Sequence, residues 1–505
     1  MSIVEQSSTS IQDAKINELR RWCEGMPRLD ACLEPWMVDV LNDHTIEVRD
    51  LVERYGSPLH VVSPAPLTRN VHLLNDVAAD RGIWFQAFFA RKANKCLTFV
   101  EAANQISAGI DVASEQECRQ TLDLGVPPEN IICTAAIKSS SLIQLCVKQG
   151  ATMAIDNFDE LKQVIHIASS TDTPVEVALR LSGFRHDGNK LHSRFGFDVD
   201  EITMVADTLR ESPEAERIRV RGIHFHLDGY CADQRVSAIQ QCLPIVDYLR
   251  SCGHDIWFLD IGGGLPISYL EDERQWNEFW STHREALLGN TSPITYRNHG
   301  LGLHRTAEGI HGERNTYPYY QSPVREQWFA EILDADSREG ISIAAALRDR
   351  TLQLRCEPGR SSLAGCGMTI ARVEFTKRHH TGDWFNGLSM NRTQCRTGSD
   401  DFLVDPIVLP QTEPRESTQR QPIAGYLVGA YCTESELIQL RRLHFPHGIS
   451  RGDLVVFPNT AGYFMHFLES RSHQFPLAQN VVFNGSPLSP FCLDRIDVPD
   501  ATIDP

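Results

Sequence analysis

The sequence predicts an α/β protein built on a (β/α)8 TIM barrel, followed by a mainly antiparallel β-domain. Eight short apolar, β-branched runs recur between residues 84 and 356. Segments of helical character separate them, which is the pattern of parallel βα units, and eight such units close a barrel. Beyond about residue 366 the rhythm changes to short strands separated by Gly and Pro, which is typical of antiparallel sheet.

The chain before the barrel is mixed in character. Residues 1–55 form an N-terminal segment that contains an amphipathic helical stretch at Ile16–Cys23. The sequence Gly56-Ser57-Pro58 marks a boundary, because Gly and Pro interrupt regular structure. Leu59–Val62, just beyond it, has the composition of a short strand.

Residues 56–365 carry the rhythm of the barrel. The eight expected strands are Trp84–Ala90, Ala108–Val112, Asn130–Cys133, Thr152–Ile155, Val175–Leu181, Val220–His226, Ile256–Ile261 and Leu352–Cys356. The expected helices include Cys96–Gln105, Glu115–Leu124, Ser140–Gln149, Asp159–Ser169, Ile202–Glu211 and Val236–Cys252. The interval after the seventh strand is too long for this rhythm, and we assign an insertion to about residues 296–340. Barrel insertions collect in such βα loops.

Residues 366–505 form the predicted β-domain. Its expected strands are Met368–Thr376, Asp401–Leu409, Gly425–Gly429, Asp453–Pro458 and Val481–Phe483. Gln411–Gln421 is rich in Glu, Arg, Pro, Thr and Gln, and we expect it to be an exposed loop.

The composition points to a small-molecule ligand. A net charge of −18 over 505 residues leaves no basic field to hold nucleic acid or an anionic membrane. The N-terminus lacks the basic and apolar regions of a signal peptide, and no run is long enough to span a membrane, so we expect a cytoplasmic protein. The 14 cysteines show no CxxC pair or metal-finger spacing, and we expect most of them to be free and buried.

Polar residues that end the expected strands form the candidate site. The chemistry of such barrels lies at the carboxyl ends of the strands, so groups placed there converge. Together they predict a site for a phosphorylated, electron-accepting ring. These residues are Lys92, Asp111, Arg180, His226, the triplet Gly262-Gly263-Gly264, and the turn Glu357-Pro358-Gly359-Arg360.

Each of these features also has a simpler explanation. The glycine triplet lets backbone N–H groups approach an anion, or it is only a tight turn. Arg360 could pair with the same phosphate or with a substrate carboxylate. Glu357 is costly to bury without a partner, which could be a protonated ring nitrogen or a basic side chain.

His224 and His226 alternate on the sixth strand and therefore face the same side. Such a pair can ligate zinc, as in amidohydrolase-like enzymes, but no matching acidic and histidine set ends the other strands, and we expect no metal. The remaining interpretations are a histidine stacked over a cofactor ring and a core histidine with a satisfied hydrogen bond.

Lys92 is either the first solvated residue after its strand or an amine that binds an aldehyde covalently. Pyridoxal 5'-phosphate combines an aldehyde, a ring nitrogen and a phosphate. The agreement among the strand ends favours this cofactor.

The chain resembles the fold-type III, pyridoxal-phosphate-dependent decarboxylases of the diaminopimelate, ornithine and arginine group. The motifs that carry the resemblance occur in family order between about residues 55 and 480. They are Ala90-Arg91-Lys92-Ala93-Asn94, Gly109-Ile110-Asp111-Val112-Ala113-Ser114-Glu115, Ser193-Arg194-Phe195-Gly196, His224-Phe225-His226, Leu259-Asp260-Ile261-Gly262-Gly263-Gly264, Cys356-Glu357-Pro358-Gly359-Arg360-Ser361, Gly429-Ala430-Tyr431-Cys432 and Gly452-Asp453-Leu454-Val455-Val456-Phe457-Pro458-Asn459.

The resemblance implies a role for each candidate. Lys92 would bind the cofactor aldehyde, His226 would stack on the ring, and Glu357 would pair with the ring nitrogen. Asp111 and Arg180 would support the lysine and the ring from one side. The residues implied to hold the phosphate are Gly262, Gly263, Gly264, Arg360 and Tyr463, and Gly359 is a further cofactor-binding residue. The resemblance also implies that the barrel has the alanine racemase-like fold.

The resemblance also implies a homodimer with active sites at the interface. Cys432 would reach the partner's site and return a proton to the substrate after carbon dioxide leaves. The N-terminal segment would join the β-domain.

Two departures from the family pattern bear on the ligands. After His226 the chain has Leu227-Asp228-Gly229-Tyr230, where relatives have a glycine and then a phosphate-binding serine. After Cys432 comes Thr433, where relatives place an acidic residue that faces the distal amine of the substrate. Glu434 or Glu436 could substitute at a shifted position. Diaminopimelate, ornithine and lysine are therefore not assumed as substrates, and the hypothesis is a modified or carboxylate-bearing amino acid. The candidate substrate-binding residues are Arg360, Thr433, Glu434 and Glu436.

Two further functions are compatible with the same scaffold. A racemase would need a second base opposite Lys92, commonly a tyrosine, whereas Cys432 favours decarboxylation. A non-catalytic regulatory homologue would have lost the lysine, the glutamate or the glycines, and all of them are present.

Overall fold

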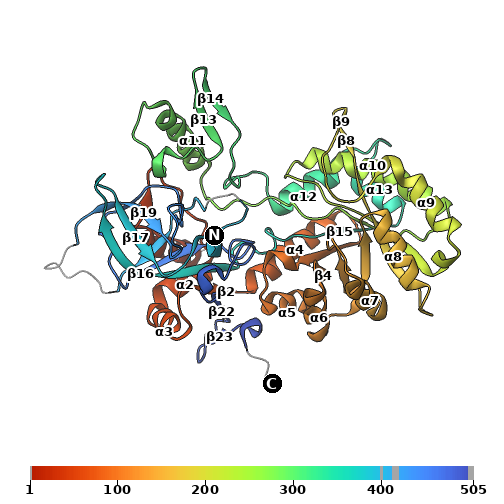
Figure 1. The fold of residues 1–505 in the computed structure, drawn as a ribbon, viewed down its shortest axis with the longest axis horizontal. Helices are drawn as coiled ribbons and strands as arrows, with labels where there is room; N and C mark the ends of the chain where they lie inside the picture. The colour runs from red at the N-terminus through yellow and green to blue at the C-terminus, as the bar shows by residue number, and fades with distance from the viewer. Residues whose placement is uncertain (1–2, 399–401, 412–419, 499–505) are drawn as a thin grey trace.

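Eight parallel strands close into a barrel in one of the two lobes of the computed structural model, which describes residues 3–398, 402–411 and 420–498 (Figure 1). Around the barrel the hydrogen-bonded order is β7-β11-β12-β15-β3-β4-β5-β6, and β6 pairs back to β7. The strands are β3 (Phe85–Ala90), β4 (Gly109–Val112), β5 (Ile131–Cys133), β6 (Thr152–Ile155), β7 (Val175–Ser182), β11 (Ile218–Phe225), β12 (Phe258–Asp260) and β15 (Gln353–Cys356). The predicted barrel is confirmed.

Helices cover the outside of the barrel. Several begin at a side chain that accepts a hydrogen bond from the first turn, such as Ser114, Ser139 and Asn157, which satisfies an otherwise unpaired N–H group. The helices are α4 (Ala65–Asp80), α5 (Leu97–Gln105), α6 (Glu115–Asp123), α7 (Ser140–Gln149), α8 (Phe158–Ala168), α9 (Ile202–Glu211), α10 (Ala232–Ser251), α12 (Arg325–Asp334) and α13 (Ile343–Asp349).

Inside the barrel, glycines on neighbouring strands make room for phenylalanine rings. A Cβ on Gly109 would lie 2.2 Å from the ring of Phe88, and one on Gly222 would lie 2.3 Å from the ring of Phe258. Both phenylalanines are fully buried. Close packing of this kind fixes the strand ends, and therefore the site, rigidly.

A ten-stranded sheet forms the centre of the second lobe. Its longest strand, β16 (Gly367–Arg378), pairs with three others, β17 (Trp384–Leu388), β2 (Leu59–Val62) and β21 (Leu454–Pro458). Most pairings are antiparallel, but β17 with β19 and β2 with β22 are parallel. The remaining strands are β1 (Glu24–Gly25), β18 (Ile407–Leu409), β19 (Ile423–Val428), β20 (Leu443–Phe445), β22 (Gln479–Phe483) and β23 (Phe491–Leu493).

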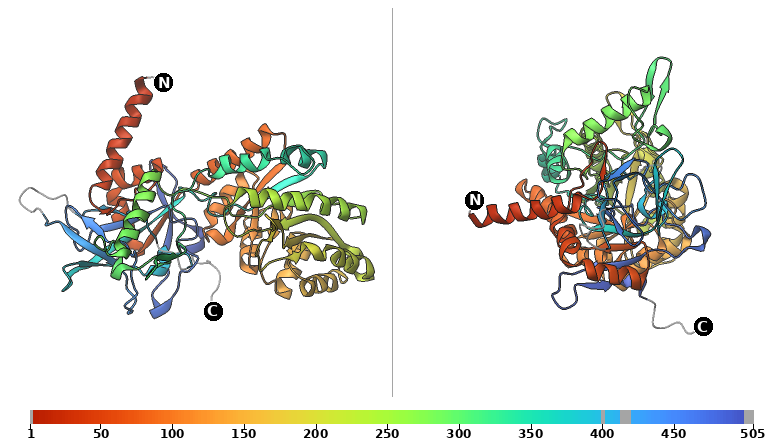
Figure 2. Two further views of the ribbon diagram at one scale, coloured as in Figure 1. Left: turned by 90° about the horizontal axis from the view of Figure 1, so that it is seen from above. Right: turned by 90° about the vertical axis from the view of Figure 1, so that its left-hand side faces the viewer.

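The part of the N-terminal segment that follows the first turns of α1 lies against this second lobe. Strand β1 pairs with β20, and the helices α2 (Pro35–Asp43) and α3 (Thr45–Tyr55) bury apolar side chains in the same core as β16 and β21. Helix α1 (Ile3–Arg20) begins earlier and ends earlier than the expected stretch 16–23, and its first turns project from the body of the molecule (Figure 2). The expected loop at 411–421 lies almost entirely outside the described residues, as does the start of the strand expected at 401–409.

The long connection between β12 and α12 packs onto the second lobe. It contains α11 (Glu273–Leu288) and the hairpin of β13 (Leu303–Thr306) and β14 (Gly309–Gly312), which stand together above the sheet in Figure 1. Trp276, Phe279 and Trp280 of α11 share a core with residues of β16, β17 and β19. Helix α12 also lies within the interval 296–340, and it packs against α4 and α10 of the barrel.

Short elements complete the chain. They are β8 (Arg185–His186), β9 (Asn189–Lys190), β10 (Phe197–Asp198) and the 3-10 turns η1 (Arg91–Ala93), η2 (Pro128–Asn130), η3 (Val199–Glu201), η4 (Pro213–Arg217), η5 (Tyr296–Asn298), η6 (Arg392–Cys395), η8 (Ser472–Gln474) and η9 (Arg495–Asp497). Among the described residues, every helix is too short or too polar to cross a membrane.

Candidate active site

Lys92 lies at the mouth of the barrel, in η1 directly after β3. Its Nζ donates to Oδ2 of Asp111, at the end of β4, over 2.8 Å. The Asp111 side chain is fully buried, whereas the Lys92 side chain is 32% exposed, so a ligand can reach the amine. Oδ1 of Asp111 accepts from the hydroxyl of Thr134, which fixes the carboxylate.

The electrostatics around Lys92 favour the protonated amine in the absence of a ligand. Burial alone would lower the pKa of Lys92, but the carboxylates of Asp111 and Glu357 outweigh it and raise that pKa above the ordinary value. A negatively charged environment therefore surrounds the amine of Lys92, and it can equally stabilise a positive charge on a ligand bound there.

Glu357 ends β15 and is held by a histidine. Its Oε1 lies 3.1 Å from Nε2 of His224, and both side chains are buried. Burial lowers the pKa of His224 well below its usual value, so the ring is neutral and its Nε2–H donates to the carboxylate. Burial raises the pKa of Glu357, while the positive charges of Lys92 and Arg180 oppose that shift. Glu357 thus has a supporting partner and a free oxygen for a cationic group.

His226, two residues after His224, contacts the glycine triplet. The backbone N–H of Gly263 donates to its Nδ1 over 3.3 Å, so the neutral ring carries its proton on Nε2. Burial, and then the charge of Lys92, lower the pKa of His226 well below its usual value. A neutral ring at this place can stack on a flat ligand without repelling it.

The glycine triplet packs too closely for any side chain. Gly262 and Gly264 have φ of 66° and 82°, values that favour glycine. A Cβ on Gly262 would lie 2.5 Å from the carbonyl oxygen of Phe225, and one on Gly263 would lie 2.9 Å from that of Glu357. The backbone of the triplet therefore packs closely between the residues at the carboxyl ends of the sixth and eighth barrel strands.

Arg360 is surrounded by aromatic rings from outside the barrel. Its Nη1 donates to the hydroxyl of Tyr269 over 2.8 Å and to the carbonyl of Gly462 over 3.2 Å. The guanidinium lies 4.2 Å from the ring centre of Tyr317 and 5.1 Å from that of Tyr463. Burial would lower the pKa of Arg360, but the neighbouring tyrosines raise it. The side chain is a fixed cation.

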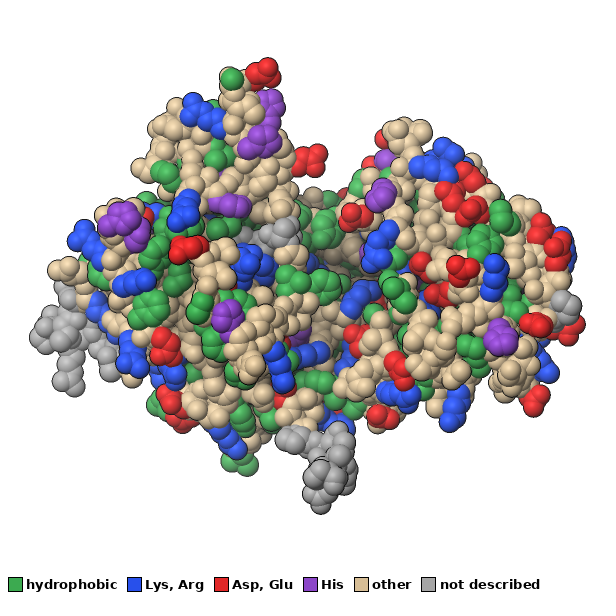
Figure 3. Space-filling model, viewed as in Figure 1, with side chains coloured by type: hydrophobic (Ala, Val, Ile, Leu, Met, Phe, Trp, Pro, Cys, Tyr) green, Lys and Arg blue, Asp and Glu red, His purple; other side chains and the backbone are tan. Residues whose placement is uncertain are grey.

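A cavity of about 250 Å³ opens between these groups, and the space-filling view shows the hollow where the two lobes meet (Figure 3). Its lining includes His226, Gly229, Gly264, Gly359, Arg360 and Tyr463. A Cβ on Gly359 would lie 2.5 Å from the hydroxyl of Tyr463, so a larger residue would fill the space. A cationic, glycine-lined cavity next to Lys92 fits a phosphorylated aldehyde.

Arg180, on β7, is bound from the barrel side. Its Nη1 lies 3.3 Å from Oδ1 of Asp156 and 3.3 Å from the carbonyl of Thr134. The guanidinium also lies 4.2 Å from the ring centre of Phe195. Through Thr134, Arg180 and Asp111 belong to one hydrogen-bonded group.

Of the predicted residues beyond position 430, Tyr463 lines the cavity, whereas Cys432, Thr433, Glu434 and Glu436 are not part of its lining in the same chain. Cys432 is exposed on the loop after β19, and Thr433 beside it is exposed too. The side chain of Glu434 is 91% exposed and lies 4.0 Å from Arg297 of η5. Glu436 is buried, and its carboxylate accepts from the backbone N–H of Arg392 over 2.8 Å.

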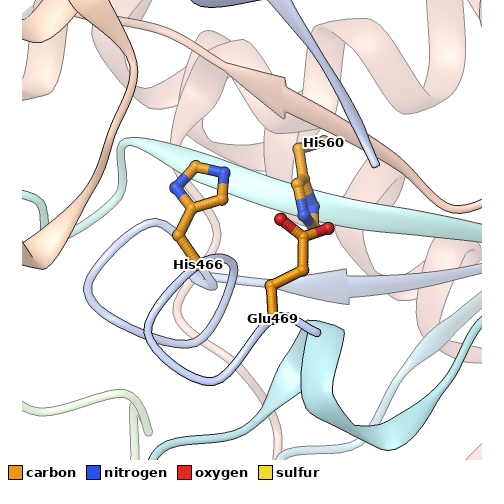
Figure 4. A group of neighbouring side chains, drawn as sticks. All are labelled: His60, His466 and Glu469. Carbon is orange, nitrogen blue, oxygen red and sulfur yellow. The ribbon is translucent and has the colours of Figure 1, made fainter. Parts of the chain in front are cut away.

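A partly buried group of polar side chains connects the Lys92 loop to the second lobe. Lys95 pairs with Oε2 of Glu469 over 2.9 Å, and its backbone N–H donates to Nδ1 of His466 over 3.3 Å. His60, His466 and Glu469 point toward one another (Figure 4), and their ligand atoms lie within 4.8 Å, a spacing compatible with a metal ion. The ammonium of Lys95 already neutralises Glu469, which argues for a structural role.

Several residues of the site were missed by the strand-end reasoning. Thr134 and Asp156 directly follow β5 and β6, so the same rule could have found them. Lys95 and Glu469 carry no such signal, because they are 374 positions apart. His224, Asp260 and Glu357 also come within 4.8 Å of one another, which the HxH pattern alone did not indicate.

Fold and site together define a barrel protein whose lysine, buried glutamate and cationic cavity fit pyridoxal phosphate. The family model for the pyridoxal-dependent decarboxylase, pyridoxal binding domain, matches residues 72–295. The "Uncharacterized protein y4yA" of Sinorhizobium fredii is 30% identical over 443 residues, which cover 87% of this chain and 90% of that protein. The chain belongs to the fold-type III pyridoxal-phosphate-dependent decarboxylases.

Two diaminopimelate decarboxylases extend the comparison. That of Pseudomonas aeruginosa is 23% identical over 424 residues, covering 82% of this chain and 84% of that protein. The crystal structure of the enzyme from M. jannaschii superposes with a TM-score of 0.66 at 17% identity, over 88% of this chain and 91% of that one, a likeness that concerns the fold. Other diaminopimelate decarboxylases are matched over 55% and 56% of their length.

The family makes the chain an amino-acid decarboxylase that uses pyridoxal phosphate. The cofactor prediction is confirmed.

Proposed function

We propose that this chain decarboxylates a modified or carboxylate-bearing amino acid at the mouth of the barrel, with Lys92 as the residue that binds the cofactor. The observation that carries the proposal is the pair of buried acids around one reachable amine. Asp111 lies 2.8 Å from Lys92, and Glu357 is held by His224 3.1 Å away. The cavity at Arg360 is also lined by Tyr463, whose backbone N–H donates to the carbonyl of Ala93, next to Lys92, over 2.9 Å.

Each residue has a part in the reaction. When bound, pyridoxal phosphate supplies an electron-accepting ring that takes up the electron pair left by the departing carboxylate. Lys92 holds the cofactor aldehyde and later releases the amine product. Glu357 stabilises a proton on the ring nitrogen, and Asp111 orients Lys92 Nζ and stabilises positive charge there.

Cys432 would return the proton to the carbon that lost the carboxylate. It is exposed and lies outside the cavity of its own chain, so this role requires a second copy of the chain. We therefore propose a homodimer in which each subunit completes the partner's site.

The acidic residues near Cys432 support a substrate without a free distal ammonium group. Thr433 carries no charge, Glu434 lies 4.0 Å from Arg297, and the carboxylate of Glu436 is engaged by the backbone of Arg392. Glu434 is exposed, and the oxygen of Glu436 that is buried without a hydrogen-bond partner lies 3.6 Å from Nε of Arg392, so neither acid is an uncompensated buried charge that would favour a second amine. A neutral or anionic distal group fits this environment better.

The test is a panel assay for released carbon dioxide with the yellow holoenzyme. The panel compares ornithine, lysine, arginine and diaminopimelate with the same backbones acylated at the distal amine, and with acidic amino acids. We expect the highest kcat/KM for acylated or acidic compounds. A clear preference for a free diamine would refute the substrate class, and stereoinversion without carbon dioxide would refute decarboxylation by this site.

A further inference from the structure

Arg235, on the barrel helix α10, is a fully buried arginine behind the cavity wall. Its Nη2 donates to three backbone carbonyls, those of Leu227, Gly229 and Gly263, over 3.1, 2.9 and 3.2 Å. Within the described part of the chain, its Nε and Nη1 are buried without a hydrogen-bond partner. Two nitrogen atoms of the guanidinium therefore have unused N–H donors, and among the described residues the group contacts no anion.

Two of the other buried cations at the mouth of the barrel have a carboxylate partner. Lys138 pairs with Glu160 over 2.8 Å, and Arg180 pairs with Asp156 over 3.3 Å. Arg235 forms no ion pair among the residues that the structure describes. Burial lowers the pKa of Arg235 to about 10, which reflects the cost of an uncompensated charge in the interior.

The carbonyls that Arg235 binds belong to the two loops that line the cavity. Gly229 and Gly264 are both in its wall, and a Cβ on Gly264 would lie within 2.4 Å of Arg235 Nη2. The positive charge is thus separated from the cavity by a single layer of glycine backbone. Arg360 lines the cavity itself.

The loop after His226 offers the cavity no hydroxyl group before Tyr230, because it reads Leu227-Asp228-Gly229. Asp228 lines the cavity and carries a negative charge, which would oppose an anion. A buried cation behind the same loop offsets that charge and leaves a net attraction.

We propose that Arg235 is a positioning residue for the cofactor phosphate. Its guanidinium binds three backbone carbonyls, so the negative oxygen atoms of these carbonyls point toward Arg235 and away from the cavity. Arg235 also adds a second positive charge to that of Arg360. Phosphate would in turn compensate the buried guanidinium. This inference rests on the proposed cofactor site at Lys92.

The experiment compares two ligands that differ only in the phosphate. The apo protein and its Arg235→Met and Arg235→Lys variants are titrated with pyridoxal phosphate and with pyridoxal, and the dissociation constants are read from absorbance or fluorescence. We expect Arg235→Met to weaken pyridoxal phosphate about 10- to 100-fold, as for loss of a charge-assisted interaction, and to change pyridoxal binding less than about twofold. Arg235→Lys should give an intermediate loss for the phosphorylated ligand.

Trp328→Phe provides the matched control. The indole N–H of Trp328 donates to the carbonyl of Tyr230 over 2.8 Å, and its ring centre lies 5.8 Å from the Arg235 guanidinium. The phenyl ring of the variant keeps an aromatic face there, so the variant loosens the same loop without removing charge. We expect it to affect both ligands equally.

Each outcome separates the hypotheses. If Arg235→Met weakens the binding of both ligands equally, Arg235 only supports the loop, and the inference is overturned. Unchanged binding of pyridoxal phosphate to Arg235→Met would overturn it too. If Arg235→Met does not fold, the ratio of the two dissociation constants in Arg235→Lys decides, and an unchanged ratio overturns the inference. A parent protein that binds neither ligand at Lys92 would instead refute the proposed function.

Discussion

Replacing Gly359 by alanine tests the cavity directly. The new Cβ would lie 2.5 Å from the Tyr463 hydroxyl and 3.1 Å from the Cβ of Ala93. Tyr463 cannot retreat easily, because its backbone N–H donates to the carbonyl of Ala93 over 2.9 Å and its φ is 73°. Overpacking of this kind costs about 1–3 kcal/mol. If the whole of this free-energy cost falls on cofactor binding, pyridoxal phosphate binds about 5- to 150-fold more weakly.

The assay is titration of the apo protein with pyridoxal phosphate, together with its melting temperature. The double variant Gly359→Ala, Tyr463→Phe serves as the control, because it removes the oxygen that makes the closest contact and should recover part of the affinity. If Gly359→Ala binds the cofactor as tightly as the parent and melts at the same temperature, the close packing around this cavity is refuted.

Three further predictions concern the lysine, the partner subunit and pH. Lys92→Ala should abolish turnover and the yellow colour, because no other amine is held beside Asp111 at the cavity; borohydride reduction of the parent should fix the cofactor on Lys92, and normal turnover by the variant would contradict the assignment. Cys432→Ala should slow product formation and promote side reactions. Mixing it with Lys92→Ala subunits should restore roughly a quarter of the parent activity, because half of the dimers would then carry one complete site; no restoration after subunit exchange would contradict a shared site. Burial lowers the pKa of His60 to about 4, whereas an unfolded histidine titrates near 6.5. The unfolded state therefore binds the extra proton between these values, so stability is fully present above about pH 6.5 and falls toward pH 4, by about 3 kcal/mol for this group. In His60→Gln the drop in melting temperature between pH 7 and pH 4.5 should be smaller, and an identical drop would contradict it.

The barrel could be predicted from sequence because its strands are buried on both faces. The run Ile131–Cys133, for example, is apolar and fully buried, and the amphipathic helix α7 follows it. The segment between β12 and α12 could not be placed in the same way. Trp276, Phe279 and Trp280 face the second lobe, and local periodicity shows that a helix has an apolar face but not what covers that face.

The candidate site was predictable where it depends on strand ends and not where it depends on distant contacts. Lys92, Asp111 and Glu357 each follow a barrel strand, so the topology brings them together. Arg235 lies within a helix, and no spacing distinguishes a buried arginine there from one on the solvated face. The pair of Lys95 and Glu469 joins two lobes and becomes visible only after folding.

Arg360, which lines the cavity, shows why contacts from outside the barrel matter for function. Arg360 follows a barrel strand, but the groups that fix its guanidinium are Tyr269 and Tyr317 from the long connection and Gly462 and Tyr463 from the second lobe. A charged side chain is useful to a ligand only when its position is set in advance, since ordering it on binding would cost affinity. Segments outside the barrel therefore control how firmly the barrel holds an anion, and the connection between β12 and α12 can alter the site without any change in the strands that carry Lys92 and Glu357.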